Sequence, residues 1–343
     1  MKLTVQAPRK RSDNSVLVLA VLSPVIAEVL SGATHLTAIF ALLPEILVWG
    51  LGAVLIREVA RRLCLTEAAL LFMGFALSLA EEILIQQTSL APLPWLDTGN
   101  PVGRAFGVNW IYLLFQLGFE SVWVVFVPIQ LVELLFPHRC TEPWLKKRGL
   151  IVASLLFLFG SFIAWYAWIK RMRPIIFHLP PYHPSPYAYL AGSISIVALL
   201  ATALVLRTPA EITSRRAPSP VLLFMAVLAL GLPWYFLLVL QFSILPALIT
   251  LPLWIPLVGG VAWGAFVWLT LRHWSLSKSW STLHRYAAVF AAMLVPMLGG
   301  LLGANAWLRI DQIAQAVFDI AAIVCMILLG RSLKKRATAA LDR

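Results

Sequence analysis

Apolar runs long enough to cross a lipid bilayer follow one another along nearly the whole chain, and they limit the folds that it can adopt. Ten runs of about 15–29 residues can be marked, and a membrane helix requires roughly 20. They cover residues 16–31, 39–60, 67–90, 108–136, 150–169, 187–206, 220–242, 244–271, 286–308 and 312–330. Because the bilayer core offers backbone groups no water, we expect these runs to be helices.

The composition excludes a soluble domain. Hydrophobic residues make up 61% of the 343 residues and charged residues only 12%, which a bundle of membrane helices tolerates because its apolar surface faces lipid. We therefore predict an all-α, polytopic transmembrane bundle of about ten spans, within a range of nine to eleven. The first apolar run follows a basic stretch and lacks a small-residue cleavage site, so we expect an uncleaved span.

The positions of Lys and Arg predict the orientation. Net charge is +12, and the basic residues fall between apolar runs, which indicates topology rather than a nucleic-acid partner. Of the 27 basic residues, 22 lie on the side that holds both termini, which predicts that both termini are cytoplasmic. The exceptions include Lys170, Arg171 and Arg173 in the stretch 170–187, which we expect to be interfacial or re-entrant unless the fifth span is misplaced.

Acidic residues gather in the first four runs. We therefore divide the chain into an N-terminal membrane region, residues 1–149, and a C-terminal membrane region, residues 150–343, and expect the functional site in the first. A charged side chain at mid-bilayer costs about 2.5–3.5 kcal/mol on insertion scales. Glu81 and Glu82 lie roughly 20 Å into the third run at about 1.5 Å per residue. Adjacent carboxylates cannot cheaply both ionise, so we expect one to be protonated unless a cation is bound.

Helical spacing predicts a polar site between the third and fourth runs. One face of the third run carries Ser78, Glu82, Gln86 and Ser89, and one face of the fourth carries Asn109, Gln116 and Glu120. Short connections favour antiparallel neighbours, so the two faces are expected to meet. The candidate functional residues are Glu81, Glu82 and Glu120, supported by Ser78, Gln86, Asn109, Gln116 and Glu45, with Glu28 as a further contributor.

Other titratable residues carry a weaker signal. Glu28, Glu58 and Glu133 lie near the ends of runs, where such side chains snorkel to the membrane surface or cap helices, and Glu58 is expected to pair with Arg57, Arg61 or Arg62. No histidine lies inside a run as marked, and no metal-binding spacing is present. We predict no cofactor, and we keep a divalent metal held by His35, His178 or His183 with Glu28 or Glu45 as a minor alternative. The three cysteines have no paired spacing.

The segment "EEILIQ" resembles the EExxxR signature of the CPBP family of membrane proteins, the CAAX proteases and bacteriocin-processing proteins. That resemblance implies an intramembrane hydrolase in which Glu81 and Glu82 activate a water molecule. Gln86 stands where the family has Arg. Glu120 stands where its second motif presents His, and its third motif has no match.

A broader resemblance covers roughly residues 23–150. "SPVIAEVLSG", "EEILIQQ", "NWIYLL" and "VPIQLVELLFP" are similar to segments of uncharacterised bacterial multi-pass membrane proteins, in which an aromatic-His pair often stands where this chain has Phe119 and Glu120. The resemblance implies a bacterial inner-membrane protein and supplies no activity.

Three functions therefore stay open. The first is a CPBP-like intramembrane protease or a degenerate relative, the second is a proton- or cation-coupled transporter, and the third is a non-enzymatic assembly protein. The sequence predicts the lipid bilayer as a partner and does not identify a substrate. Pro24, Pro44 and Pro128 are expected to allow the broken helices that a transporter uses.

Overall fold

Helices make up nearly all the regular structure of the chain. The computed structural model describes residues 14–92, 102–180, 182–207, 211–212, 214, 216–242, 245–302, 304 and 307–341. Within these residues, nine helices are long and apolar enough to cross a membrane, and a shorter apolar helix, Ser15–Val29, precedes them. The prediction of an all-α polytopic bundle of about ten spans is confirmed.

Most spans consist of more than one helical element. The α-helices are α1 (Ser15–Pro24), α2 (Leu42–Glu45), α3 (Leu51–Arg62), α4 (Glu67–Ala80), α5 (Trp110–Phe119), α6 (Val127–Leu135), α7 (Lys147–Trp165), α8 (Pro186–Val205), α9 (Pro220–Gly231), α10 (Tyr235–Gln241), α11 (Pro246–Ile249), α12 (Trp254–Ser275), α13 (Thr282–Gly300) and α14 (Arg309–Leu341). The π-helical segments are η1 (Val25–Val29), η3 (Ile46–Gly50), η4 (Glu81–Ile85), η5 (Glu120–Phe126) and η7 (Tyr166–Ile176). The 3₁₀ turns are η2 (Leu36–Ala41), η6 (Pro137–Arg139) and η8 (Leu232–Trp234). One small antiparallel hairpin, β1 (Arg104–Ala105) and β2 (Val108–Asn109), precedes α5.

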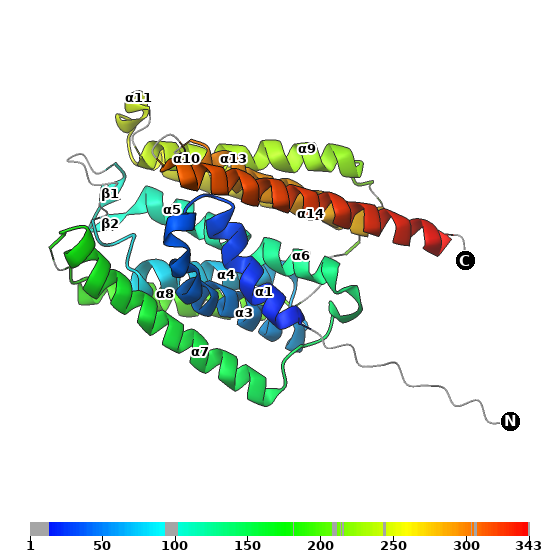
Figure 1. The fold of residues 1–343 in the computed structure, drawn as a ribbon, viewed down its shortest axis with the longest axis horizontal. Coiled ribbons are helices and arrows are strands. Elements are labelled where there is room, and N and C mark those ends of the chain that lie inside the picture. The colour runs from blue at the N-terminus through cyan, green and yellow to red at the C-terminus, as the bar shows by residue number, and fades with distance from the viewer. Residues whose placement is uncertain are drawn as a thin grey trace.

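The helices lie in two groups around the span formed by α5, η5 and α6 (Figure 1). Helices α9, α10, α13 and α14 lie on one side of it, and α3, α4, α7 and α8 lie on the other. Tryptophan hydrogen bonds join the first group to the central span: Trp123 Nε1 donates to the Ala292 carbonyl at 2.7 Å, and Trp234 Nε1 donates to the Phe115 carbonyl at 3.2 Å. Helix α1 begins and α14 ends at the same end of the bundle, as an even number of crossings requires. The division at residue 149 stays a prediction.

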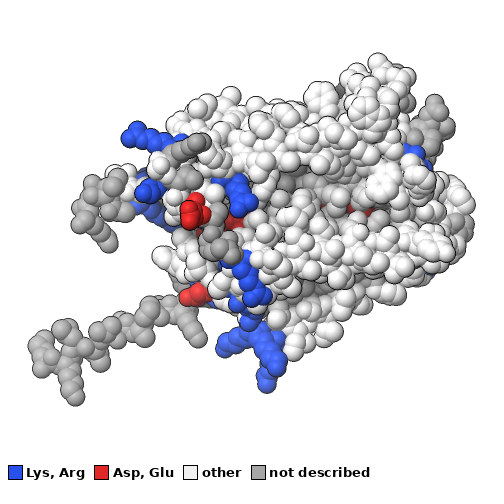
Figure 2. Space-filling view, turned by 180° about the vertical axis from the view of Figure 1, so that it is seen from behind, with Lys and Arg blue, Asp and Glu red and all other residues white. Residues whose placement is uncertain are grey.

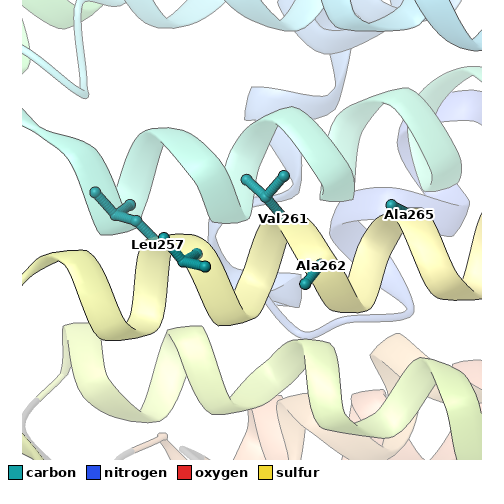
Figure 3. A pocket seen from close by; sticks show the side chains of 5 residues that line it. Leu257, Val261, Ala262 and Ala265 are labelled. Atoms are coloured by element: carbon teal, nitrogen blue, oxygen red, sulfur yellow. The ribbon is translucent and has the colours of Figure 1, made fainter.

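The surface has the pattern of a membrane protein. In the view of Figure 2, most Lys and Arg side chains gather at one end of the molecule, a smaller group lies at the opposite end, and the surface between them is mostly uncharged. We call the first of these the basic end. Helix α3 ends and α13 begins there, with Arg57, Arg61 and Arg62 near the C-terminus of α3 and Arg285 in the first turn of α13. Helix α12 bears a shallow apolar groove lined by Leu257, Val258, Val261, Ala262 and Ala265 (Figure 3). Its exposed valines and lack of polar lining fit contact with lipid chains.

Two predicted spans have different ends in the structure. The third ends at Ile85 rather than at residue 90, because Gln87 takes a left-handed conformation with φ of 60°. The fifth continues to Ile176 rather than ending at residue 169, so it contains the basic residues of the exceptional stretch. Arg173 is only 2% exposed and donates to the Pro92 carbonyl at 2.6 Å. That arginine therefore holds the loop at Pro92 in place, and the interfacial or re-entrant position of the stretch 170–187 stays a prediction.

The first and second spans approach each other closely at Gly50. A Cβ at this position would overlap the Ala20 carbonyl, a backbone group that cannot move aside alone. We expect Gly50→Ala to lower the free energy of unfolding in detergent by about 1–3 kcal/mol, as overpacking does. Gly259→Ala is the control, because nothing lies within 4 Å of its Cβ position. Equal melting temperatures for the two variants would contradict this packing.

Candidate functional site

The deep glutamates coincide with the π-helical segments. Glu28 lies in η1, Glu81 and Glu82 begin η4, Glu120 begins η5, and Glu45 directly precedes η3. Four of the five π-helical segments among the described residues thus carry or adjoin a glutamate. π-Helical turns are rare and frequently lie at functional sites. Their coincidence with carboxylates indicates a candidate functional site.

The structure brings these five glutamates into one electrostatic group, which we call the carboxylate cluster: Glu28, Glu45, Glu81, Glu82 and Glu120. Glu81, Glu82 and Glu120 are 1–2% exposed, whereas Glu28 and Glu45 are partly buried. The approach of α4 to η5 brings the three buried ones together. It depends on Gly74, whose Cβ would lie 2.9 Å from Cα of Ser121.

Glu82 is the best-anchored carboxylate of the cluster. Its Oε2 accepts hydrogen bonds from the hydroxyls of Thr88 and Ser89, both at 2.6 Å, and its Oε1 accepts one from Nε2 of Gln116 at 3.2 Å. Three donors satisfy an ionised carboxylate, which only accepts hydrogen bonds. The predicted contact between the polar faces of the third and fourth spans is confirmed by the bond from Gln116.

Glu81 and Glu120 have a different environment. Both carboxylates are buried, and no described residue gives either of them a hydrogen bond of normal geometry. Gln86 is the polar side chain that acts on Glu81, and Ser78 is the one that acts on Glu120. The predicted stripe through Ser78, Glu82 and Gln86 is therefore divided between two carboxylates, because the π-turn rotates the residues that follow it.

Glu28 and Glu45 share one hydroxyl. The Oγ1 atom of Thr34 lies 2.9 Å from Oε1 of Glu45 and 3.2 Å from Oε2 of Glu28. Thr34 is itself buried, in the turn that joins the first two spans. The second Glu45 oxygen has no partner among the described residues.

No ion pair between described residues neutralises the cluster, since none includes any of the five carboxylates. The carboxylates also act on two buried tyrosines: Glu28, Glu82 and Glu120 on Tyr112, and Glu28 on Tyr235. The cluster therefore needs protons or bound cations to reduce its repulsion.

A second acidic group at the basic end is fully paired. Arg57 and Arg61 bind Glu133 at 3.1 and 2.8 Å, and Arg285 of α13 approaches it at 3.4 Å. Glu58 pairs with Arg57 and Arg62, as the sequence predicted, and accepts bonds from the backbone N–H groups of residues 144 and 145. We call this set the ion-pair network: Arg57, Glu58, Arg61, Arg62, Glu67, Glu133 and Arg285.

The structure does not support the metal alternative. In the part of the chain that is described, no three His, Cys, Asp or Glu side chains are placed to hold a metal ion together. His35 packs its ring on Trp307 with centroids 4.9 Å apart. His273 and His284, which the sequence placed outside the spans, lie in the last turn of α12 and the first turn of α13, where His284 contributes to a capping box.

Several residues of the site were not predicted. Thr34 and Thr88 lie in turns, so helical periodicity carries no signal for them, and Tyr112 was not distinguished from the apolar residues around it. Asn109 was predicted as part of the polar face of the fourth span. In the structure its side chain caps α5 by accepting a bond from the N–H of Tyr112 at 3.1 Å.

Comparison with known proteins gives one partial match. Residues 17–167 are similar to the model of an uncharacterized membrane protein family. The matched segment is less than half of the chain but holds the whole carboxylate cluster. No curated protein and no solved structure matches the chain. The comparison therefore supports a multi-pass membrane protein of uncertain activity, in line with the broader of the two resemblances.

Proposed function

We propose that the chain is a carrier that exchanges protons for a monovalent cation at the carboxylate cluster. The observation that supports this function best is the group of five glutamates, each in or beside a π-helical segment, with no basic partner among the described residues. Intramembrane ionisable residues of this kind mark ion pathways and proton relays.

Protons and cations compete for the carboxylates of the cluster. Five carboxylates in an apolar surrounding cannot all be ionised, so most of the negative charge must be cancelled by protons or by cations. Glu82, with three hydrogen-bond donors, keeps its charge most readily and is the expected cation ligand. Glu81 and Glu120, without such donors, are the expected proton carriers. A proton that leaves one of them restores a binding charge beside Glu82.

Proteoliposomes with a trapped pH-sensitive dye test this function. We expect an inward Na⁺ or K⁺ gradient to drive a change of internal pH in the wild type, and Glu82→Gln and Glu120→Gln to slow it by about tenfold or more. Glu142→Gln is the control, since its side chain is 67% exposed and lies outside the cluster. Absence of the response in the wild type with both cations, or its persistence in both cluster variants, would overturn the proposal.

An intramembrane hydrolase is the second candidate. It is supported by the adjacent Glu81 and Glu82 beside Glu120, an arrangement in which one carboxylate can activate water while another holds the proton. Against it, the ring of His35 is engaged with Trp307.

Cleavage of single-span membrane peptides, followed by mass spectrometry, distinguishes the two candidates. A hydrolase produces fragments in the wild type and none in Glu82→Gln or Glu120→Gln. Fragments that persist in either variant would exclude these residues from the chemistry. An assembly role is supported instead if both variants leave exchange and cleavage unchanged but dissociate in detergent.

A further inference from the structure

We infer that Glu28 and Glu45 hold one proton between them through the hydroxyl of Thr34, and that this pair is the entry point for protons to the carboxylate cluster. The role as an entry point rests on the proposed function, whereas the shared proton rests on the geometry alone.

The hydrogen-bond inventory of Thr34 supports the shared proton. A threonine hydroxyl has one hydrogen to donate and two lone pairs that accept, while an ionised carboxylate has none to donate. The hydroxyl oxygen lies within hydrogen-bond distance of both carboxyl groups, at 2.9 and 3.2 Å. The one hydroxyl hydrogen is either shared between the two acceptors or donated to Glu45 alone, at the shorter distance. In the second arrangement Glu28 carries a hydrogen that it donates to the hydroxyl, and this is the arrangement that we infer.

Among the described residues, neither glutamate belongs to an ion pair. The neighbouring His35 packs its ring on Trp307. Glu81 interacts electrostatically with both glutamates, and Glu120, Tyr112 and Tyr235 interact with Glu28. On the side of α14, Asp311 is occupied by hydrogen bonds from the N–H and the hydroxyl of Thr37, at 3.0 and 2.9 Å.

The position of the pair suits entry from the end opposite the basic end. Its turn packs against the last turn of α13 and the first turn of α14, where Gly300 meets the Ser31 backbone and Asp311 binds Thr37. Ala33, Leu36 and Thr37 are exposed, Glu28 and Glu45 are partly buried, and the other three carboxylates are buried. The pair therefore lies between the surface and the deep carboxylates.

A proton can pass between the two glutamates through Thr34 without any net gain or loss of hydrogen by the hydroxyl. Glu28 gives its proton to the Thr34 oxygen while the original hydroxyl hydrogen moves to Glu45. This converts a protonated Glu28 and an ionised Glu45 into the reverse pair. Glu81, which interacts electrostatically with both, is the next acceptor toward Glu82.

Infrared difference spectroscopy of the protein in lipid tests the shared proton. We expect a carbonyl band of a protonated carboxyl group that disappears in Glu28→Gln and also in Glu45→Gln, because either change leaves one carboxylate that Thr34 can satisfy alone. Thr34→Val should shift the band to higher frequency, and Thr34→Ser, which keeps the hydroxyl, should restore it. A band that persists in both glutamine variants, that is lost in only one of them, or that ignores Thr34→Val would overturn the shared proton.

Proton–cation exchange in proteoliposomes tests the entry role. We expect Thr34→Val to slow exchange by about tenfold or more and Thr34→Ser to remain close to the wild type. A Thr34→Val variant with a shifted band and wild-type exchange would overturn the entry role and leave the shared proton standing. A wild type without exchange would instead defeat the proposed function, and the infrared result would still decide the protonation of the pair.

Discussion

Replacement of Glu133 by alanine is expected to lower the free energy of unfolding by about 3–5 kcal/mol, the cost of breaking a buried ion pair by removal of one partner. Arg57 is fully buried and depends on Glu133 for a charged bond at 3.1 Å. Its other contacts are the carbonyls of residues 139, 140 and 142, the Trp144 ring, and the Glu58 carboxylate at a longer 3.6 Å. Glu58 also pairs with Arg62, so the loss of Glu133 would leave Arg57 with one distant, shared carboxylate and no charged hydrogen bond.

Denaturant titration in mixed micelles measures the effect. Glu142→Ala is the matched control, because its pair with Arg139 is long, at 3.9 Å, and exposed. An exposed pair contributes about 0–1 kcal/mol. Arg285→Ala should fall between the two, since Arg285 is 29% exposed and lies 3.4 Å from Glu133. Similar losses for Glu133→Ala and Glu142→Ala would show that the ion-pair network does not stabilise the fold.

The sequence predicted the spans well and their interruptions poorly. Apolar length decides whether a segment crosses a membrane, and that property is local. A π-helical turn depends on packing, and the expected breaks at Pro24, Pro44 and Pro128 are in the structure short π-helical segments nearby rather than gaps in the helices. The segment η4 contains no proline. Its position could not be read from residue types.

The candidate site shows the same limit. Depth along a helix follows from residue counting, so Glu81, Glu82 and Glu120 could be selected from the sequence, and Gln116 could be placed opposite Glu82. The direction of the side chains that follow Glu82 could not be predicted from the sequence, because one inserted residue rotates the helix by about 100°. The bond from Arg285 to Glu133 joins residues 152 positions apart, a distance at which local patterns give no information.

The two acidic groups differ in what they contribute: the ion-pair network stabilises the fold, whereas the carboxylate cluster is expected to serve function. In the ion-pair network each of Glu58, Glu67 and Glu133 has an arginine, and the network joins α3, α4, α6 and α13. In the carboxylate cluster charge is left without a partner, which costs free energy that a purely structural role would not require. Natural proteins retain such groups where function depends on them, and removing them often raises stability.

Glu81 and Glu82 allow that contrast to be tested at adjacent positions. We expect Glu82→Met to lower the free energy of unfolding by about 3 kcal/mol, since each buried polar group left without its partner costs about 1–3 kcal/mol. The groups affected are Thr88, Ser89 and Gln116, which all donate to Glu82. We expect Glu81→Met to be neutral or stabilising. Its carboxylate has no hydrogen bond of normal geometry from a described residue, and methionine is of similar size and flexible.

Hydrogen exchange of the backbone distinguishes the two variants. Residues 86–91 follow the end of η4, and Thr88 and Ser89 are held there by Glu82. Their amides should exchange faster in Glu82→Met and at the wild-type rate in Glu81→Met, whereas both variants should lose proton–cation exchange. Since Glu81→Met keeps the fold, its loss of exchange could not be attributed to misfolding. A stable Glu81→Met variant that still exchanges protons would mean that the unpartnered carboxylate carries none.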